Sequence, residues 1–296
     1  PVHTTDFGHD NIFGFSTSNL AKWIEEKSFG KIQAKNILHV KIKQLDMAFD
    51  DEDGFESLLE FLSKLENNTS VVVDAKLPHH LETLANAIKV VSKEKRFLFR
   101  TAASFINSLS ALPPNPKCTA DLVSLKSKNN EYKYKPGLII VGSHVKLATD
   151  QLEVLLKDNS CKGLEIPVSK LADIFALEDC QQAILELEDT LLSKIDDILD
   201  LEKVPVLYTT REEIKFSSCA KRMNFGLELA EFMAILVGKI NHKFGYIISK
   251  GGITTQLLLQ RGLNFNQVIL KGQILPGLSI VQSNSDQNNL PVVTFP

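Results

Sequence analysis

The chain has 296 residues, of which 44% are hydrophobic and 23% are charged, and its formal net charge at pH 7 is −3. This balance is typical of a globular protein with room for two domains of about 100–200 residues each, and it excludes an intrinsically disordered chain. It also speaks against nucleic acid or an anionic membrane as a partner, because no net positive charge is present. A small anionic ligand needs only local charge and stays open.

Hydropathy and cysteine usage narrow the class further. The longest uncharged apolar stretches, such as "FMAILVG", are far shorter than the roughly 18 residues of a membrane span. The four cysteines are spaced irregularly and form no C-x-x-C pattern, which predicts neither a zinc site nor a disulfide framework. We therefore expect reduced thiols in a cytoplasmic protein.

Short apolar runs in the first third of the chain alternate with segments of helical periodicity. The runs that predict buried strands lie at 36–42, 70–76 and 96–101. Apolar residues three and four positions apart predict helices at 19–28, 55–66 and 79–93. Two stretches rich in Pro, Asn and Lys follow, at 112–117 and 126–137, and they predict a linker over 113–136.

The same alternation continues after this linker. Strands are predicted at 137–143, 204–210, 245–249 and 291–295, and helices at 147–158, 181–203 and 226–240. Alternating strands and helices indicate an α/β protein with largely parallel sheets flanked by helices. We expect two such domains, 1–112 and 137–296, with the active site in a cleft between them.

In open α/β sheets, ligands bind at the carboxyl ends of the strands, so the residues at these ends are the first candidates for a site. They are Asp74, Arg100, Ser143, Thr209 to Arg211, and Lys250 to Gly252. Arg100 and Arg211 are two of only five arginines, and a guanidinium suits a carboxylate or a phosphate. The alternative is an arginine that pairs with a neighbouring acid or a strand-end carbonyl.

The stretch "SKGGITT" (249–255) joins a predicted strand to a predicted helix. Its glycines let the backbone approach a ligand, Lys250 adds a charge, and Thr254 and Thr255 add hydroxyls, so the segment indicates an anion-binding loop. It matches neither G-x-x-x-x-G-K-[ST] nor G-x-G-x-x-G, and a plain turn remains the alternative. "VGSHVKLATDQ" (141–151) repeats the arrangement around Ser143, without the G-x-S-x-G context of a hydrolase.

The histidines give weaker signals. His144, next to Ser143, is either a general base or a hydrogen-bonded loop residue. His79 and His80 open a polar helix without an H-x-x-x-H partner, which favours surface positions over metal ligands. No metal-ligand pattern is identified elsewhere in the sequence.

Several stretches together resemble one family, the four-carbon acid sugar kinases. "TTDFGHDNIFGFSTSNLAKWIEEKSFGKI", "VVVDA" and "FLFRTAASF" are similar to the later half of its substrate domain. "VGSHVKLATDQL", "VLYTTRE", "YIISKGGITT" and "GQILPGLSIV" are similar to successive elements of its nucleotide-binding domain. The resemblance covers almost the whole chain in the correct order, so 1–112 corresponds to the C-terminal part of the substrate domain.

The resemblance implies an ATP-dependent kinase that phosphorylates a hydroxyl of threonate, erythronate or a related acid, with Mg²⁺. It implies that Ser143 and the loop of Gly251, Gly252, Ile253 and Thr254, with Lys250, contact ATP, and that Arg100 helps to hold the substrate carboxylate or the domain interface. Asp10, which is also a candidate substrate-binding residue, and Asp74 are candidates for the base on spacing alone, and the alternative for each is a cap or a surface carboxylate. A homo-oligomer stays open.

The family's acidic-acidic-x-Thr-Gly strand end and its closing Pro-Gly-rich loop have no counterpart in this sequence. We therefore expect the 296 residues to be an internal portion of a longer protein, and activity of this portion alone is in doubt. The alternative function is a nucleotide- or metabolite-binding regulator that has lost catalysis. A dehydrogenase is disfavoured because G-x-G-x-x-G is absent.

Overall fold

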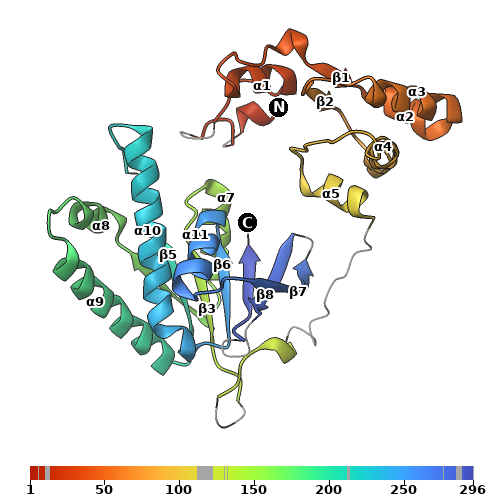
Figure 1. Cartoon of the computed structure of the whole chain (residues 1–296). Helices are drawn as coiled ribbons and strands as arrows, with labels where there is room; N and C mark the ends of the chain where they lie inside the picture. Colours follow the sequence, from red (N-terminus) through yellow and green to blue (C-terminus); the bar gives the residue numbers. More distant parts are fainter. Residues whose placement is uncertain are drawn as a thin grey trace. The chain divides into compact units, whose positions relative to one another are not determined.

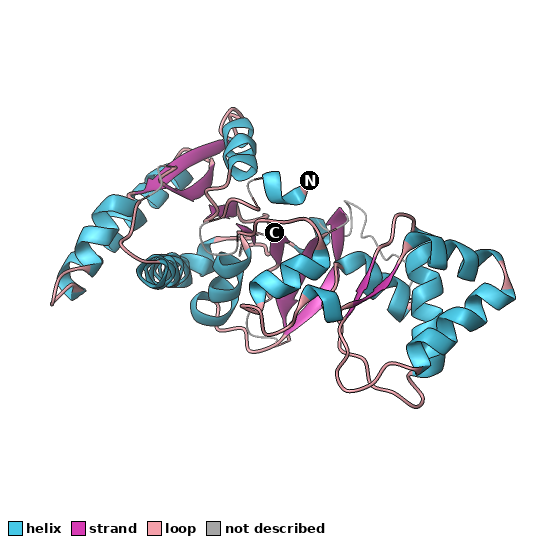
Figure 2. Cartoon of the chain, turned by 90° about the horizontal axis from the view of Figure 1, so that it is seen from above, coloured by secondary structure: helices cyan, strands magenta, loops and turns pink. Residues whose placement is uncertain are grey.

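A computed structural model describes residues 1–5, 7–10, 14–111, 123–129, 131, 133–211, 214–275, 277–284 and 289–295. The chain divides into two compact units, Pro1–Pro114 and Asn115–Pro296 (Figure 1). Helices flank a sheet with parallel strands in each unit, which confirms the predicted α/β class with two domains (Figure 2). None of the helices described is long and apolar enough to cross a membrane.

The N-terminal unit is mainly helical and contains a small parallel sheet. Its strands, β1 (Leu38–Val40) and β2 (Val71–Val73), have three residues each and pair in parallel. Its α-helices in the described chain are α1 (Leu20–Lys27), α2 (Ile42–Asp50), α3 (Glu52–Ser63), α4 (Pro78–Val91) and α5 (Ala103–Ser110), with short 3₁₀ turns η1 (Val2–Thr4) and η2 (Ala34–Asn36). Because two such short strands are marginal alone, the helix core must supply most of this unit's stability.

That core lies between the helices and one face of the sheet. Leu45 of α2, Leu58 of α3 and Leu84 and Ile88 of α4 pack in one cluster with Val40 of β1. Helix α3 begins at a side-chain cap, in which the Asp51 carboxylate accepts from the backbone N–H of Gly54. Val40, Val71 and Val73 on one face therefore pack on the helix core, while His39 and Asp74, described below, lie on the other face with the buried Val72.

The predicted strand at 96–101 is wrong. This segment pairs with no strand among the described residues, and Leu98 within it is 101% exposed. Phe97 packs against the helix core instead. The apolar run predicts a strand, but a strand requires a neighbour to hydrogen-bond with, and the described residues provide none.

The C-terminal unit is built on a seven-stranded sheet in the order β4-β5-β3-β6-β9-β8-β7. The strands are β3 (Gly137–Val141), β4 (Cys161–Ile166), β5 (Val204–Thr209), β6 (Tyr246–Lys250), β7 (Val268–Leu275), β8 (Leu278–Ser283) and β9 (Val292–Phe295). The first five in the sheet order are parallel, and the β7–β8 hairpin adds antiparallel strands at one edge. All five residues of β3 are buried, which explains its continuous apolar run.

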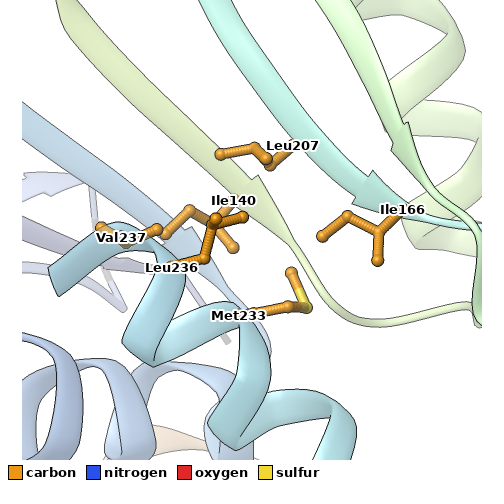
Figure 3. Close-up of a pocket in the computed structure, with 6 residues that line it drawn as sticks. All are labelled: Ile140, Ile166, Leu207, Met233, Leu236 and Val237. Carbon is orange, nitrogen blue, oxygen red and sulfur yellow. The ribbon is translucent and has the colours of Figure 1, made fainter. Parts of the chain in front are cut away.

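Long helices cover this sheet and fill its core. The helices are α7 (Lys146–Leu155), α8 (Val168–Phe175), α9 (Gln181–Asp200), α10 (Cys219–Ile240) and α11 (Gly252–Leu257), with the short turns η3 (Asn241–Lys243) and the π-helical η4 (Leu258–Gly262). Side chains of β3, β4 and β5 face Met233, Leu236 and Val237 of α10 and leave no space for a water molecule (Figure 3). This part of the interior is packed solid, so a ligand must bind at the sheet's edge or surface.

The predicted linker at 113–136 is described only in its second half. There the N–H of Ser127 donates to the carbonyl of Gly245 at 3.0 Å, and the N–H of Gly245 donates to Pro136 at 2.8 Å. These bonds attach the segment to the end of the sheet where β6 begins. Residues 113–122 lie outside the described chain, so the linker itself stays a prediction.

Candidate functional site

Two neighbouring loops meet at the carboxyl end of the parallel strands. Strands β3 and β6 lie side by side, with Val141 opposite Lys250, and the N–H of Gly142 donates to the Lys250 carbonyl at 3.3 Å. After β3 the chain continues through α7 towards β4, and after β6 it continues through α11 towards β7, on the opposite side of β3. Loops that diverge in this way mark the position where open α/β sheets bind ligands.

Missing side chains allow the two loops to approach each other. A methyl group at Gly142 would lie 2.1 Å from the Thr254 hydroxyl oxygen, so only glycine fits there. Gly251 has φ +106°, a conformation that L-residues rarely adopt, and a methyl group there would lie 3.7 Å from the Ser143 nitrogen. Gly252 has open space around it and no such constraint. The doubled glycine of the sequence is therefore a steric requirement at its first position only.

We call the group Gly142, Ser143, Gly251, Gly252, Ile253 and Thr254 the cradle. No hydrogen bond within the described chain uses the backbone N–H of Ser143, Gly252 or Ile253. The hydroxyls of Ser143 and Thr254 likewise have no partner among the described residues, although Thr254 is only 7% exposed. No buried side-chain polar atom in the described chain lacks a partner, so the two hydroxyls reach the surface, and together with the backbone N–H groups they can bind a ligand with several acceptor oxygens.

Positive charge surrounds the cradle. The Arg211 guanidinium donates to the Ser143 carbonyl at 2.7 Å and to the carbonyl and hydroxyl of Thr209 at 2.7–2.9 Å. These acceptors are neutral, so its charge is not cancelled by them, and burial lowers the pKa of Arg211 below its ordinary value. The Lys250 ammonium lies 3.9 Å from the ring centre of Phe295, and burial lowers the pKa of Lys250 from 10.5.

Arg211 fulfils the alternative interpretation of the sequence, because it binds strand-end carbonyls. By joining Ser143 to Thr209 it ties the loop after β3 to the end of β5. Thr210 makes a second tie, since its hydroxyl donates to the Ile166 carbonyl at 3.1 Å and accepts from the N–H of Val168 at 3.2 Å. His144 lies 3.4 Å from a nitrogen of Arg222. On the side of β4 and β5, the cradle is thus held by side chains that already hydrogen-bond to backbone groups.

In the N-terminal unit, Asp74 stands directly after β2. Its N–H donates to the Val40 carbonyl at 3.0 Å, and its carboxylate accepts from Nε2 of His39 at 2.7 Å. The Arg100 guanidinium lies over the Trp23 ring at 4.6 Å and is exposed. The Asp10 carbonyl accepts from the N–H of Gly14 at 2.8 Å. The substrate roles of Arg100 and Asp10 and the base role of Asp74 stay predictions.

The prediction that His79 and His80 are surface residues is wrong for His80, which is 1% exposed. Its Nε2 lies 2.8 Å from the Asp46 carboxylate, and its Nδ1 accepts from the N–H of Lys76 at 3.1 Å and, more weakly, Leu77. His79 is half-buried and stacks on Phe49.

Asp46, His79 and His80 are close enough to hold a metal ion. A ligating histidine, however, normally donates its second ring N–H to a neighbour, whereas Nδ1 of His80 accepts. The ring is therefore set to cap α4 and to bind α2.

Two domain families match the chain, one in each unit. Residues 1–109 match the family described as sugar-binding N-terminal domain, and residues 138–296 match the nucleotide-binding C-terminal domain. The chain belongs to the four-carbon acid sugar kinase family. All residues of the cradle lie within the nucleotide-binding match.

Two solved structures share the fold along almost the whole chain. One is a Salmonella typhimurium LT2 protein provisionally named a tRNA synthase, with 14% identity and a TM-score of 0.59 over 99% of this chain and 63% of that one. The other is Haemophilus influenzae protein HI1011, of the DUF1537 family, with 18% identity and a TM-score of 0.50 over 99% and 64%. The chain thus spans less than two thirds of either protein. No curated protein matches it.

Sequence reasoning found most of the cradle but missed two features. The strand-end rule identified Ser143 and Lys250 to Gly252, and the composition of "SKGGITT" added Thr254; the structure brings these two loops together. It did not identify Gly142 as a packing partner of Thr254, because that contact joins residues 112 positions apart. It also missed His39, although two-residue alternation along β1 and β2 places His39 and Asp74 on one face of the sheet.

Proposed function

We propose that the cradle binds the phosphates of ATP and that the protein transfers the γ-phosphoryl group to a hydroxyl of a four-carbon sugar acid of the threonate or erythronate class. The observation that carries this proposal is the set of unpartnered donors in the cradle, three backbone N–H groups and two hydroxyls. A triphosphate presents many acceptor oxygens and negative charge, and Arg211 and Lys250 add positive charge beside it. Phosphoryl transfer depends mainly on such positioning and charge stabilisation.

Mg²⁺ would enter with the nucleotide, because this ion keeps several waters and binds substrate phosphates together with few protein oxygens. The cradle offers the hydroxyls of Ser143 and Thr254, and Glu165 at the end of β4 is the nearby carboxylate that contacts Thr210 at 3.4 Å. The ion would neutralise charge on the phosphates. In the sugar-binding unit, Arg100 is the proposed partner of the acid's carboxylate, and its exposed position over Trp23 leaves the guanidinium accessible.

Calorimetric titration of the chain with MgATP tests the nucleotide site. Thr254→Val keeps the side chain's shape and removes its hydroxyl, so we expect about 10-fold weaker binding with little change in melting temperature, since a hydrogen bond to a charged group contributes about 1.5–3 kcal/mol. Thr190→Val is the matched control, because that hydroxyl bonds within α9 to the Glu186 carbonyl. Equal affinity of both variants and wild type would remove the cradle from the site.

A second assay addresses the reaction. ADP release is measured with a panel of tetronates, and we expect turnover that depends on both ATP and one of the acids. Saturable ATP binding without acid-dependent ADP release would instead identify a nucleotide-binding regulator. The two measurements therefore separate the nucleotide site from the catalytic assignment.

A further inference from the structure

His39 and Asp74 form a hydrogen-bonded pair at the end of the small parallel sheet. His39 lies in β1 opposite Val72 of β2, so alternation places His39, Val72 and Asp74 on the same face. The bond from the Asp74 N–H to the Val40 carbonyl fixes the backbone at the carboxyl end of β2. The carboxylate then reaches Nε2 of His39 at 2.7 Å. Val40, on the opposite face, packs on the helix core, whereas on this face Val72 is buried and the side chains of His39 and Asp74 are 37% and 47% exposed.

The bond determines where the imidazole carries its proton. An ionised carboxylate can only accept, so in the neutral ring Nε2 holds the hydrogen and Nδ1 keeps its lone pair. No described residue bonds to Nδ1 of His39, and the side chain is 37% exposed. A ring that is oriented by a carboxylate and has an accessible lone pair is the arrangement by which histidines act as general bases.

We propose that His39 is the general base of the sugar kinase reaction and that Asp74 is its positioning residue. This inference rests on the proposed function and changes the sequence-based expectation that Asp74 itself takes the proton. One carboxylate oxygen of Asp74 is already occupied by His39, and at neutral pH an imidazole is the stronger base of the two residue types. The pair lies in the sugar-binding unit, where the acceptor hydroxyl must be held.

The step balances as follows. Nδ1 of His39 takes the proton of the acceptor hydroxyl as its oxygen forms a bond to the γ-phosphorus of ATP. The bond between that phosphorus and the β,γ-bridging oxygen breaks, and its electron pair leaves with ADP. His39 becomes an imidazolium, whose charge the Asp74 carboxylate stabilises, and it returns the proton to solvent after the phosphorylated acid leaves.

The second histidine–aspartate pair in this unit differs from the first in the two properties that a general base needs. Asp46 and His80 lie 2.8 Å apart, nearly the same distance. There, however, Nδ1 accepts from backbone N–H groups, so its lone pair is already used. The ring is also buried, so a substrate has no access to it. Only the His39 pair combines both properties, among the histidine–aspartate pairs in the described chain.

The test measures tetronate phosphorylation by the full chain and its His39→Ala, His39→Gln and Asp74→Asn variants. For both His39 variants we expect kcat to fall about 100-fold or more, with ATP affinity unchanged, since general base catalysis contributes about 10²–10⁴-fold. Added imidazole should restore part of the activity of His39→Ala and none of the activity of Asp74→Asn. His242→Ala, an exposed histidine of the C-terminal unit, is the control and should behave as wild type.

The outcomes separate this inference from the function on which it rests. Wild-type turnover with undiminished kcat in both His39 variants would overturn the base assignment and leave the kinase proposal intact. Reduced kcat without rescue by imidazole would also overturn it, because a structural role predicts that result. Absence of wild-type turnover despite ATP binding would overturn both. Circular dichroism of each variant confirms that the comparison is made on folded protein.

Discussion

The cradle lies beyond the ends of β3 and β6, the histidine–aspartate pairs lie around β1, β2, α2 and α4, and the two regions are constructed in opposite ways. In the cradle, the loops approach because Gly142 and Gly251 have no side chains, and its donors stay unpartnered. In the N-terminal unit, imidazoles and carboxylates fix the segments around β1 and β2 by bonding to each other and to backbone groups. The difference teaches that added atoms should disrupt the first region, whereas removed atoms should disrupt the second.

The largest effect is expected from Gly142→Ala. The new methyl group would lie 2.1 Å from the Thr254 hydroxyl oxygen and 3.2 Å from the Thr254 Cβ, so Thr254 or one of the two loops must shift. Overpacking of this kind costs about 1–3 kcal/mol of stability, and displacing the hydroxyl and both loops should weaken ATP binding on the order of 100-fold. Gly226→Ala in α10, where the methyl group meets nothing, is the control. Calorimetry and thermal melting measure both, and normal ATP affinity in Gly142→Ala would break the comparison.

At His80, the removal of the side chain should destabilise the N-terminal unit. His80→Ala takes away the acceptor for the N–H of Lys76 and the partner of Asp46, so we expect a loss of about 2–4 kcal/mol in the N-terminal unit. Hydrogen exchange should show faster opening of α2 and α4, with β3 and β6 unchanged. His79→Ala, which removes only half-buried ring contacts, should cost less. Equal losses in the two variants would contradict the assigned role of His80.

The two adjacent glycines sharpen the comparison within the cradle. Gly251→Ala forces a side chain into φ +106°, which costs about 1–3 kcal/mol, whereas Gly252→Ala meets open space and should change stability by less than about 0.5 kcal/mol. Urea unfolding of the two variants measures the difference. Similar unfolding midpoints would show that the loop after β6 adapts to an added methyl group.

The smallest expected effect is a pH dependence at Lys250. Because burial lowers its pKa below 10.5, the ammonium loses its proton at lower pH than an exposed lysine does. ATP affinity should therefore fall by roughly twofold to fivefold as pH rises towards 10.5. The effect is small because Lys250 is partly exposed and solvent screens its charge. In that window the unfolded chain binds more protons, so this group's contribution to stability rises with pH. Lys250→Met should lack both trends. If the variant and wild type showed the same dependence of ATP affinity on pH, a contact between Lys250 and phosphate would be excluded.

Much of the C-terminal fold follows from the sequence, because β3, β5, β6 and β9 are β-branched apolar runs whose residues are buried or half-buried. Strand β4, "CKGLEI", was missed since it alternates polar and apolar residues at the sheet's edge. No strands were predicted for the β7–β8 hairpin, whose stretch "GQILPGLSIV" was noted only for its resemblance to the family. The N-terminal unit was harder, because its strands have three residues and the apolar run at 96–101 pairs with nothing described.

The site was predictable where the information is local. Ser143 and Lys250 to Gly252 follow from the strand-end rule, which needs only the strands themselves, and Thr254 follows from the composition of the residues that come next. The role of His80 depends on Asp46, 34 residues earlier, and that of His39 on Asp74, 35 residues later. Such pairs depend on register and on helix packing, which periodicity alone does not specify.

Strand β9 has a consequence for the order in which the molecule assembles. It follows β7 and β8 in sequence, yet it lies between β8 and β6 in the sheet. During synthesis on the ribosome, the hairpin must therefore wait beside an incomplete sheet until residues 292–295 emerge and bridge it to the parallel strands. Since Phe295 also carries the ring beneath Lys250, the nucleotide site should mature at the same late moment.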